Sequence, residues 1–242
     1  MASQKRLFQY HKQFVTHYMR FLTRFNTVKE SVLPEGPLIF AANHPTTTDP
    51  FLLPILVNDP IHILVIETAF EVPLLGKLIA KAGHHRVSRQ RGSGGKLIEQ
   101  ALESLRAGNH VGIFPEGMLS APDGTMGHAH SGAARIALQS GNPVIPVGIH
   151  ISPNAYIEKR LKNQPGEPPI RWIVRGSYYM TVGRPIHLEG DPNDVAQVQA
   201  ASQVIMNAIQ IQTHKSRRRM QLYPSNWHMV FRMIHRLQAI FS

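Results

Sequence analysis

Apolar residues in this chain alternate between short continuous runs and stripes at helical spacing, a pattern typical of an α/β protein. Four short apolar runs predict buried strands, at residues 37–43, 61–66, 110–114 and 143–150. Two prolines in the last run favour either an edge strand or the end of a strand. Two later apolar runs, 170–176 and 178–183, are predicted to pair with each other.

Helix-like stripes lie between these runs. The first covers residues 97–105 and is closed by Gly108, the second covers 132–140 and ends at Gly141, and the third covers 193–211. A chain of 242 residues is long enough for one sizeable α/β core. We therefore expect a mixed, largely parallel sheet flanked by helices, with the core domain over residues 31–212.

The net charge of +11 is concentrated at the two ends of the chain. Six Lys and Arg residues and no acid precede Glu30, and six more with no acid follow Asp194. The middle is left with 14 bases against all 15 acids, so it is close to neutral. This distribution counts against a nucleic-acid-binding core.

Aromatic and aliphatic residues recur between the basic ones at both ends. Residues 1–30 are predicted to form a basic amphipathic helix, and residues 213–242 a basic amphipathic segment that begins with HKSRRR. Such segments suit an anionic membrane surface, although each stripe would also be explained by packing on the core. No apolar run approaches the ~20 residues of a spanning helix, and the polar start lacks an apolar signal core. We expect a peripheral protein on the cytoplasmic face of a membrane.

Candidate chemistry lies in the stretch NHPTTTD, which places His44 five residues before Asp49. Pro50 favours a helix that begins at Asp49, so this carboxylate has a simple alternative role as a cap. If residues 45–48 form a loop, the imidazole can fold back on the carboxylate. The carboxylate then fixes the tautomer of His44, and its second ring nitrogen can take a proton from a hydroxyl group.

The hydroxyl group is best assigned to a substrate. The chain has no cysteine and no GxSxG nucleophile elbow, which removes the thiolate and the usual serine nucleophile. The residues therefore favour direct transfer to an alcohol, without a covalent enzyme intermediate.

Four segments together resemble a known family. NHPTTTD (43–49), PLLGKLIAKAGHHRVSR (73–89), FPEGMLS (114–120) and VIPVGIH (144–150) are similar, in order and rough spacing, to the four blocks of the glycerolipid acyltransferases. That family includes glycerol-3-phosphate and 1-acylglycerol-3-phosphate acyltransferases. By this resemblance His44 is the general base and Asp49 its orienting partner.

The resemblance also implies substrate-binding residues. Arg89 would hold the phosphate of the acceptor, Glu116 and Gly117 would shape the acceptor site, and Pro146 would line the acyl-donor side. Taken singly, Arg89 is equally well a solvated loop charge, Glu116 a cap of a turn, and Pro146 a mark of an edge strand. The implied donors are acyl-CoA or acyl carrier protein thioesters, with no metal or other cofactor.

One position departs from the family pattern. Leu119 stands where the third block usually carries an arginine, so either Arg86 or Arg91 compensates or the acceptor lacks a phosphomonoester. The histidine pairs His84–His85 and 128–130 lack a clear third ligand nearby, and we do not predict a metal site.

The sequence thus predicts an acyltransferase that moves a fatty acyl group from a thioester to a lysophospholipid such as 1-acylglycerol-3-phosphate, in phospholipid biosynthesis. The alternatives are a related enzyme with a different lysolipid or alcohol acceptor, and a non-catalytic protein that binds lipid or nucleic acid through its basic ends.

Overall fold

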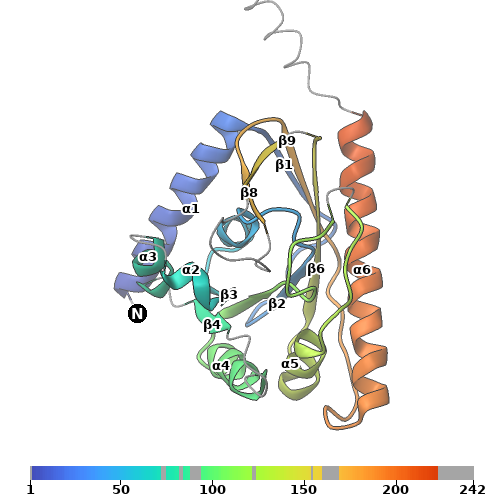
Figure 1. Ribbon diagram of the computed structural model, residues 1–242. Coiled ribbons are helices and arrows are strands. Elements are labelled where there is room, and N and C mark those ends of the chain that lie inside the picture. Colours follow the sequence, from blue (N-terminus) through green and yellow to red (C-terminus); the bar gives the residue numbers. More distant parts are fainter. Residues whose placement is uncertain are drawn as a thin grey trace, which may run out of the picture.

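A computed structural model of the chain places a central sheet between helices on both faces (Figure 1). The structure describes residues 2–71, 75–81, 84–87, 94–121, 124–153, 155–159 and 169–222. Over these residues seven strands form one sheet in the order β1-β9-β6-β2-β5-β3-β4. Each neighbouring pair is parallel except β6 with β9, so the expected mixed, largely parallel sheet is confirmed. The strands are β1 (Arg24–Lys29), β2 (Ile39–Ala42), β3 (Ile61–Ile66), β4 (His85–Val87), β5 (His110–Ile113), β6 (Val144–Ile151) and β9 (Ser177–Val182).

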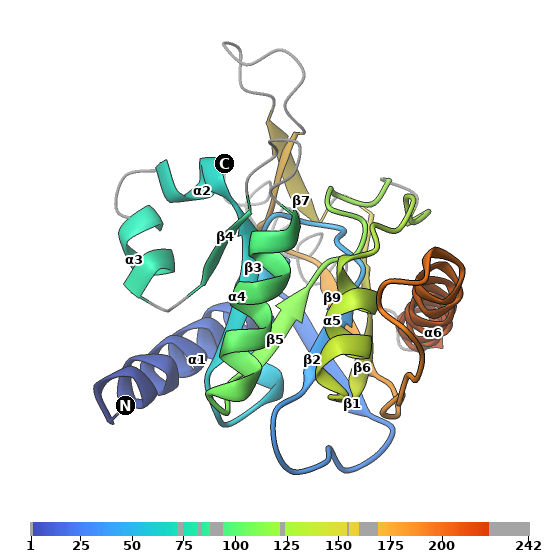
Figure 2. The same ribbon diagram turned by 90° about the horizontal axis from the view of Figure 1, so that it is seen from below.

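Helices cover the two faces of the sheet in separate groups (Figure 2). On one face, α4 (Gly94–Arg106), α5 (Gly132–Ser140) and α6 (Val195–Leu222) pack over Ile39 and Ala41 of β2. On the other face, α1 (Ala2–Leu22) and the short 3₁₀ helices η1 (Asp49–Phe51) and η2 (Leu53–Leu56) pack over Phe40 and Ala42. Alternation of side chains along β2 therefore divides the core into two layers. The short helices α2 (Glu67–Glu71) and α3 (Leu75–Lys81) follow β3.

The proline-containing run is not at an edge, because β6 lies between β9 and β2. The carbonyl of Pro146 accepts a hydrogen bond from Gly183 N, just after β9 ends. The absent N–H of Pro146 points to the same side of the strand, where the β9 ladder has already stopped. An interior strand therefore tolerates this proline. The edge alternative is wrong, whereas the alternative of a strand end agrees with the position of both prolines at the start of β6.

The expected pairing of residues 170–176 with 178–183 is also wrong. β8 (Ile170–Ile173) instead pairs antiparallel with β7 (Tyr156–Lys159) in a separate two-stranded sheet, while β9 joins the main sheet. Gly176, at a φ of 86°, lies in the connection from β8 to β9, and an added Cβ there would lie 2.3 Å from Ser152 Oγ. Glycine is the residue that tolerates this left-handed turn and close approach.

Both predicted end segments differ from the expected boundaries. Helix α1 ends at Leu22, and the next residues form β1 rather than more helix. Helix α6 runs through the boundary expected after residue 212 and continues to Leu222; residues 223–242 lie outside the described part of the chain. The reason is close packing: an added Cβ at Gly148 of β6 would lie 2.0 Å from the backbone of Gln212 and Thr213. Ser216, fully buried, donates a hydrogen bond to the carbonyl of Gly148.

Histidines 84 and 85 are partly buried and make hydrogen bonds within the protein. His84 Nδ1 accepts a hydrogen bond from Ile63 N, and burial lowers the pKa of His84 to about 3. His62 and His85 both contact Ser104 Oγ, at 2.9 and 2.6 Å. Among the residues that the structure describes, no group of three or more His, Asp or Glu side chains is arranged to hold a metal ion.

Candidate active site

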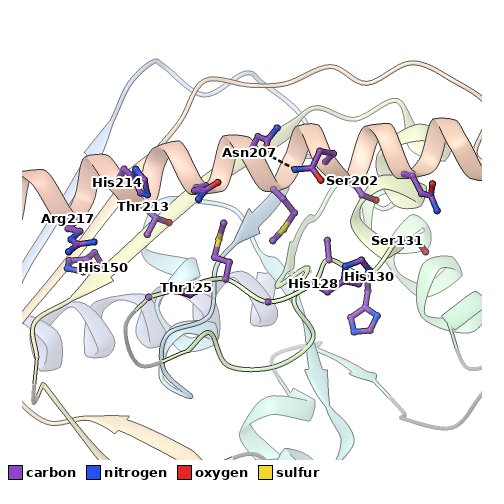
Figure 3. Close-up of a pocket in the computed structure, with 18 residues that line it drawn as sticks. Thr125, His128, His130, Ser131, His150, Ser202, Asn207, Thr213, His214 and Arg217 are labelled. Carbon is purple, nitrogen blue, oxygen red and sulfur yellow. Dashed lines mark hydrogen bonds between the residues drawn. The ribbon is translucent and has the colours of Figure 1, made fainter.

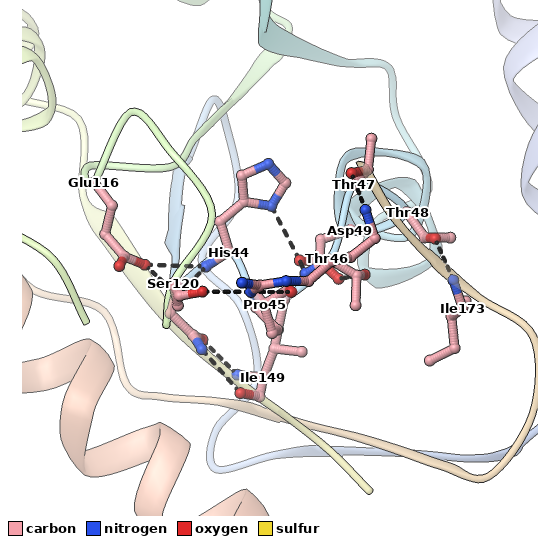
Figure 4. Close-up of polar contacts among 12 residues, drawn as sticks. His44, Pro45, Thr46, Thr47, Thr48, Asp49, Glu116, Ser120, Ile149 and Ile173 are labelled. Atoms are coloured by element: carbon pink, nitrogen blue, oxygen red, sulfur yellow. Dashed lines mark hydrogen bonds and ion pairs between the residues drawn. The ribbon is translucent and has the colours of Figure 1, made fainter. Parts of the chain in front are cut away.

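His44 and Asp49 meet across a tight loop at the end of β2 (Figure 4). His44 Nδ1 lies 3.0 Å from Asp49 Oδ2, and Asp49 begins the 3₁₀ helix η1, as the proline at position 50 predicts. Residues 45–48 form the loop that this geometry requires. The expected contact between imidazole and carboxylate is confirmed, and Asp49 is both the first residue of a helix and the partner of a histidine.

The Asp49 carboxylate is fully buried and accepts four hydrogen bonds. Oδ2 accepts from His44 Nδ1 and from the backbone N of Thr46 (2.7 Å). Oδ1 accepts from Thr46 Oγ1 (2.6 Å) and from the hydroxyl of Tyr178 (2.7 Å). Burial, followed by the charge of Asp49 and its hydrogen bond, raises the pKa of Tyr178 well above its usual value, so the phenol stays a donor. The four donors compensate the cost of burying a carboxylate. Because an ionised carboxylate only accepts hydrogen bonds, Nδ1 of His44 carries the hydrogen of their contact.

The imidazole of His44 is held flat against Phe114, with ring centroids 4.2 Å apart and an interplanar angle of 23°. Its Nε2 points away from Asp49 (Figure 4), and the side chain is 16% exposed. Within the described part of the chain Nε2 has no hydrogen-bond partner. Nε2 is therefore the ring nitrogen that remains accessible.

The backbone of His44 is fixed by the loop that follows β5. Its N–H donates to Glu116 Oε1 and Ser120 Oγ, both at 3.1 Å, and its carbonyl accepts from Ser120 N at 2.8 Å. The other carboxylate oxygen of Glu116 accepts from Gly127 N at 2.6 Å. Both oxygens of this buried glutamate thus have protein partners, so Glu116 holds the histidine loop and the 124–131 loop together.

All three threonines of HPTTTD are used to fix the loop. Thr46 binds Asp49, as described above. Thr47 exchanges two hydrogen bonds with the backbone of Arg171. Its own backbone N–H donates to the carbonyl of Arg171, and its hydroxyl accepts from the backbone N–H of Arg171. Thr48 Oγ1 accepts from Ile173 N at 3.1 Å. The histidine loop is therefore attached along its length to β8.

Arg171 reinforces this attachment from inside the protein. It is 6% exposed, and its guanidinium donates to the carbonyl of Ser120 at 2.5 Å, to that of Pro45 at 3.4 Å and to Glu158 at 2.8 Å. The sequence analysis missed Arg171, Tyr178 and Ser120. The one available signal for Arg171 was a charged residue inside the otherwise apolar run IRWI.

The remaining sequence-predicted residues lie at different distances from this pair. Gly117 is next to Glu116 at a φ of 64°, and an added Cβ would lie 2.8 Å from the ring of His130. Pro146 is buried in β6 opposite Ala41, a residue inside β2 and three positions before His44 in the chain. Arg89 lies outside the described residues. The structure brings His44, Asp49, Glu116 and Gly117 together, but not Pro146.

Comparison with known proteins identifies the family. A sequence model of the Acyltransferase family matches residues 24–150, which is more than half of the chain. The chain belongs to the Acyltransferase family. All four blocks of the expected resemblance overlap this matched region, and the assignment to the glycerolipid acyltransferases is confirmed.

Two curated relatives of this acyltransferase chain differ in their named acceptors. One is a 1-acyl-sn-glycerol-3-phosphate acyltransferase from Borreliella burgdorferi, 25% identical over 138 residues, which are 57% of this chain and 55% of that protein. The other is a lyso-ornithine lipid O-acyltransferase from Pseudomonas aeruginosa, 36% identical over 118 residues, which are 48% of this chain and 44% of that protein. The acyltransferase chain thus spans about half the length of the curated relatives it matches.

A solved structure supports the acyltransferase fold. The crystal structure of the 1-acyl-sn-glycerophosphate (LPA) acyltransferase PlsC from Thermotoga maritima superposes with a TM-score of 0.61. The superposition covers 86% of this chain and 81% of that protein, at 19% identity. At this level of identity the match concerns the fold alone.

Proposed function

We propose that this protein is an O-acyltransferase in phospholipid biosynthesis in which His44 acts as the general base. Nε2 takes the proton of an acceptor hydroxyl, and the acceptor oxygen forms the new ester bond to the thioester carbonyl carbon. The carbon–sulfur bond then breaks, and the proton passes to the departing thiolate. Asp49 holds the ring in the required tautomer and stabilises the imidazolium formed during transfer. The observation that carries this proposal is the buried, four-fold hydrogen-bonded Asp49 on Nδ1 of a histidine whose Nε2 is accessible.

For the acceptor we propose a lysophospholipid such as 1-acylglycerol-3-phosphate. Support comes from the names of curated relatives, among them a Pseudomonas aeruginosa protein that is 26% identical over 170 residues. Arg89, two residues beyond the end of β4, is the candidate for the phosphate, because a guanidinium binds phosphate oxygens in pairs. For the donor we propose an acyl-CoA or acyl carrier protein thioester, with no metal or other cofactor.

A second acceptor class is favoured by one residue. Leu119 replaces a positive charge in the third block, and the relative with 36% identity is named for a lyso-ornithine lipid. Arg86 is one candidate to supply the positive charge that Leu119 lacks, and its guanidinium lies 4.7 Å from the ring centroid of Phe70. A zwitterionic or neutral lysolipid is therefore the alternative acceptor.

A panel of acceptors tests the proposed function. Purified full-length protein is incubated with long-chain acyl-CoA and, separately, with glycerol 3-phosphate, lysophosphatidic acid, lysophosphatidylcholine or lyso-ornithine lipid. Released thiol and the acylated product are both quantified. We expect product with lysophosphatidic acid, while product with lyso-ornithine lipid alone would move the substrate to the second class. Failure of every acceptor with both acyl-CoA and acyl carrier protein donors would overturn the function.

For the site of action we propose the cytoplasmic face of a membrane, with α1 as the contact surface. Tyr10, Phe14 and Phe21 on one side of α1 are 69%, 71% and 83% exposed, whereas Val15 and Met19 on its other side are buried in the core. Lys12 ties the helix to the core by donating to the carbonyl of Val57 at 2.6 Å. Across the described residues, no helix combines the length and the apolar character needed to cross a membrane.

Replacing two of these aromatics is expected to release the protein from membranes. In the Phe14→Ser, Phe21→Ser double variant, binding to anionic phospholipid vesicles should fall by about tenfold or more, because each phenyl ring contributes roughly 1.5–3 kcal/mol when it leaves water. Flotation of vesicles measures the bound fraction. The matched control is the double variant Val204→Ser, Ile211→Ser, which removes two exposed apolar residues from α6 instead. Equal flotation of both double variants would refute a membrane role for α1.

A further inference from the structure

A groove of about 800 Å³ lies between the 124–131 loop and helix α6 (Figure 3). Residues of the loop form one wall, one side of α6 from Gln199 to Arg217 forms the other, and His150 of β6 also lines the groove. The rise of the helix from Gln199 to Arg217 is about 27 Å, so the groove can follow an extended chain-like ligand. Among the described residues, His44, Asp49, Glu116, Gly117 and Pro146 do not line this groove.

Hydrogen bonds connect the groove to the His44 loop on two sides. On the loop side, Glu116 accepts from His44 N–H with one oxygen and from Gly127 N–H with the other. On the strand side, Asn43, next to His44 in the chain, exchanges two hydrogen bonds with the backbone of Ile149, next to His150 (2.9 and 2.7 Å). A ligand in the groove would therefore lie beside the loops that hold the base.

The lining has the character of a site for an anionic, amide-rich ligand. None of the 18 described lining residues is acidic, whereas four are histidines and one is Arg217. Burial, and then the charge of Arg217, lower the pKa of His150 to about 4, so this ring is a neutral hydrogen-bonding group beside a fixed cation. Along the same wall, α6 presents side-chain amides and hydroxyls, including Gln199, Ser202, Gln203, Asn207 and Gln210, of which Gln203 donates a hydrogen bond to Asn207.

We propose that this groove binds the phosphopantetheine arm of the thioester donor, a chemical group common to acyl-CoA and acyl carrier protein. The inference rests on the proposed function. The phosphate would pair with Arg217 near His150, since a guanidinium contact to phosphate is the strong, charge-assisted kind. The two amides and the hydroxyl of the pantetheine chain match the Gln, Asn and Ser side chains of α6. The thiol end would approach His44 past His130. The ring of His130 lies over Gly117, and its backbone N–H donates to the carbonyl of Pro115.

Two charge changes in full-length protein test this assignment. Arg217→Gln removes the cation, and Gln210→Glu adds an anion at an exposed position of the lining, where folding is not at stake. We expect each to raise the KM for acyl-CoA by roughly tenfold, with kcat and the KM for the lysolipid within about twofold. Arg184→Gln and Gln139→Glu are the matched controls, because they make the same substitutions at exposed positions that do not line the groove.

Calorimetric binding of 4′-phosphopantetheine and of pantetheine supplies a measurement that does not need turnover. The wild-type protein is expected to prefer the phosphorylated compound by about tenfold, and Arg217→Gln to lose that preference. Binding of 4′-phosphopantetheine without turnover of any acceptor would support the groove assignment and contradict the proposed function. Turnover with an unchanged KM for acyl-CoA in both groove variants would overturn the groove assignment and leave the function intact. A rise confined to the KM for the lysolipid would also overturn it, because the groove would then hold the acceptor.

Discussion

Acyl transfer by the His44→Ala variant is expected to be lower than that of the wild-type protein by roughly 10²–10⁴-fold, the usual contribution of a general base. Nε2 is the accessible ring nitrogen of His44, because Nδ1 contacts Asp49. The loss should appear in kcat, since the ring is proposed to act on the proton that moves during transfer. Thiol release at saturating donor and acceptor measures it.

The fold of this variant should be close to that of the wild-type protein. The loop keeps its attachments through backbone groups of residue 44, which an alanine also provides, and through Thr46, Thr47 and Thr48. Circular dichroism and thermal melting check this, and His187→Ala, at an exposed position away from the site, controls for loss of a histidine. A folded His44→Ala protein that keeps more than a tenth of the wild-type kcat would show that another group is the base.

Local chemistry explains why the contact between His44 and Asp49 could be predicted from the sequence. A proline after Asp49 starts a helix there, and the residues between His44 and Asp49 then have to form a turn. Both conclusions depend on neighbours within six positions in the chain. The strands at 37–43, 61–66, 110–114 and 143–150 were likewise visible, because a buried strand is a short apolar run wherever it is placed.

The supports of the pair could not be predicted in this way. Tyr178 is 129 positions from Asp49, and Arg171 is 51 positions from the Ser120 carbonyl that it binds. No periodicity in the sequence reports which distant strand end will lie against a given loop. The apolar composition of 170–176 and 178–183 gave the strands but not their partners, since pairing depends on how the whole sheet is ordered.

The predicted domain boundary after residue 212 is wrong for a related reason. The basic run after residue 213 was interpreted as the start of a separate surface segment, yet Arg219 donates hydrogen bonds to the carbonyl of Met180 and to Thr181 Oγ1. Small residues, Gly148 on β6 and Ser216 on α6, allow the helix to approach the sheet closely enough for these contacts. Charge alone does not distinguish a solvated arginine from one whose guanidinium group donates hydrogen bonds to a strand.

The second large effect is expected for Asp49→Asn, which keeps the size of the side chain and removes its charge. An amide has one accepting oxygen, whereas the carboxylate receives hydrogen bonds on both of its oxygens from His44, Thr46 and Tyr178. The amide NH₂ would face two donors, so the His44 contact is lost or the ring adopts the wrong tautomer. We expect kcat to fall by roughly 10²–10³-fold, and the free energy of unfolding to fall by about 1–3 kcal/mol. Steady-state kinetics and urea unfolding measure the two effects.

Tyr178→Phe is the matched control for this experiment, because it removes one hydrogen bond from Asp49 and leaves the contact with His44 in place. Its free energy of unfolding should fall by about 1 kcal/mol and its kcat by less than about tenfold. Both variants disturb the same buried hydrogen-bond network. A much larger loss of kcat in Asp49→Asn than in Tyr178→Phe would therefore show that the carboxylate orients the histidine. Equal losses of kcat in the two variants would instead mean that Asp49 acts only through the stability of the loop, as the helix-start residue of η1. In that case His44 would have to be oriented by its backbone contacts to Glu116 and Ser120 and by the ring of Phe114.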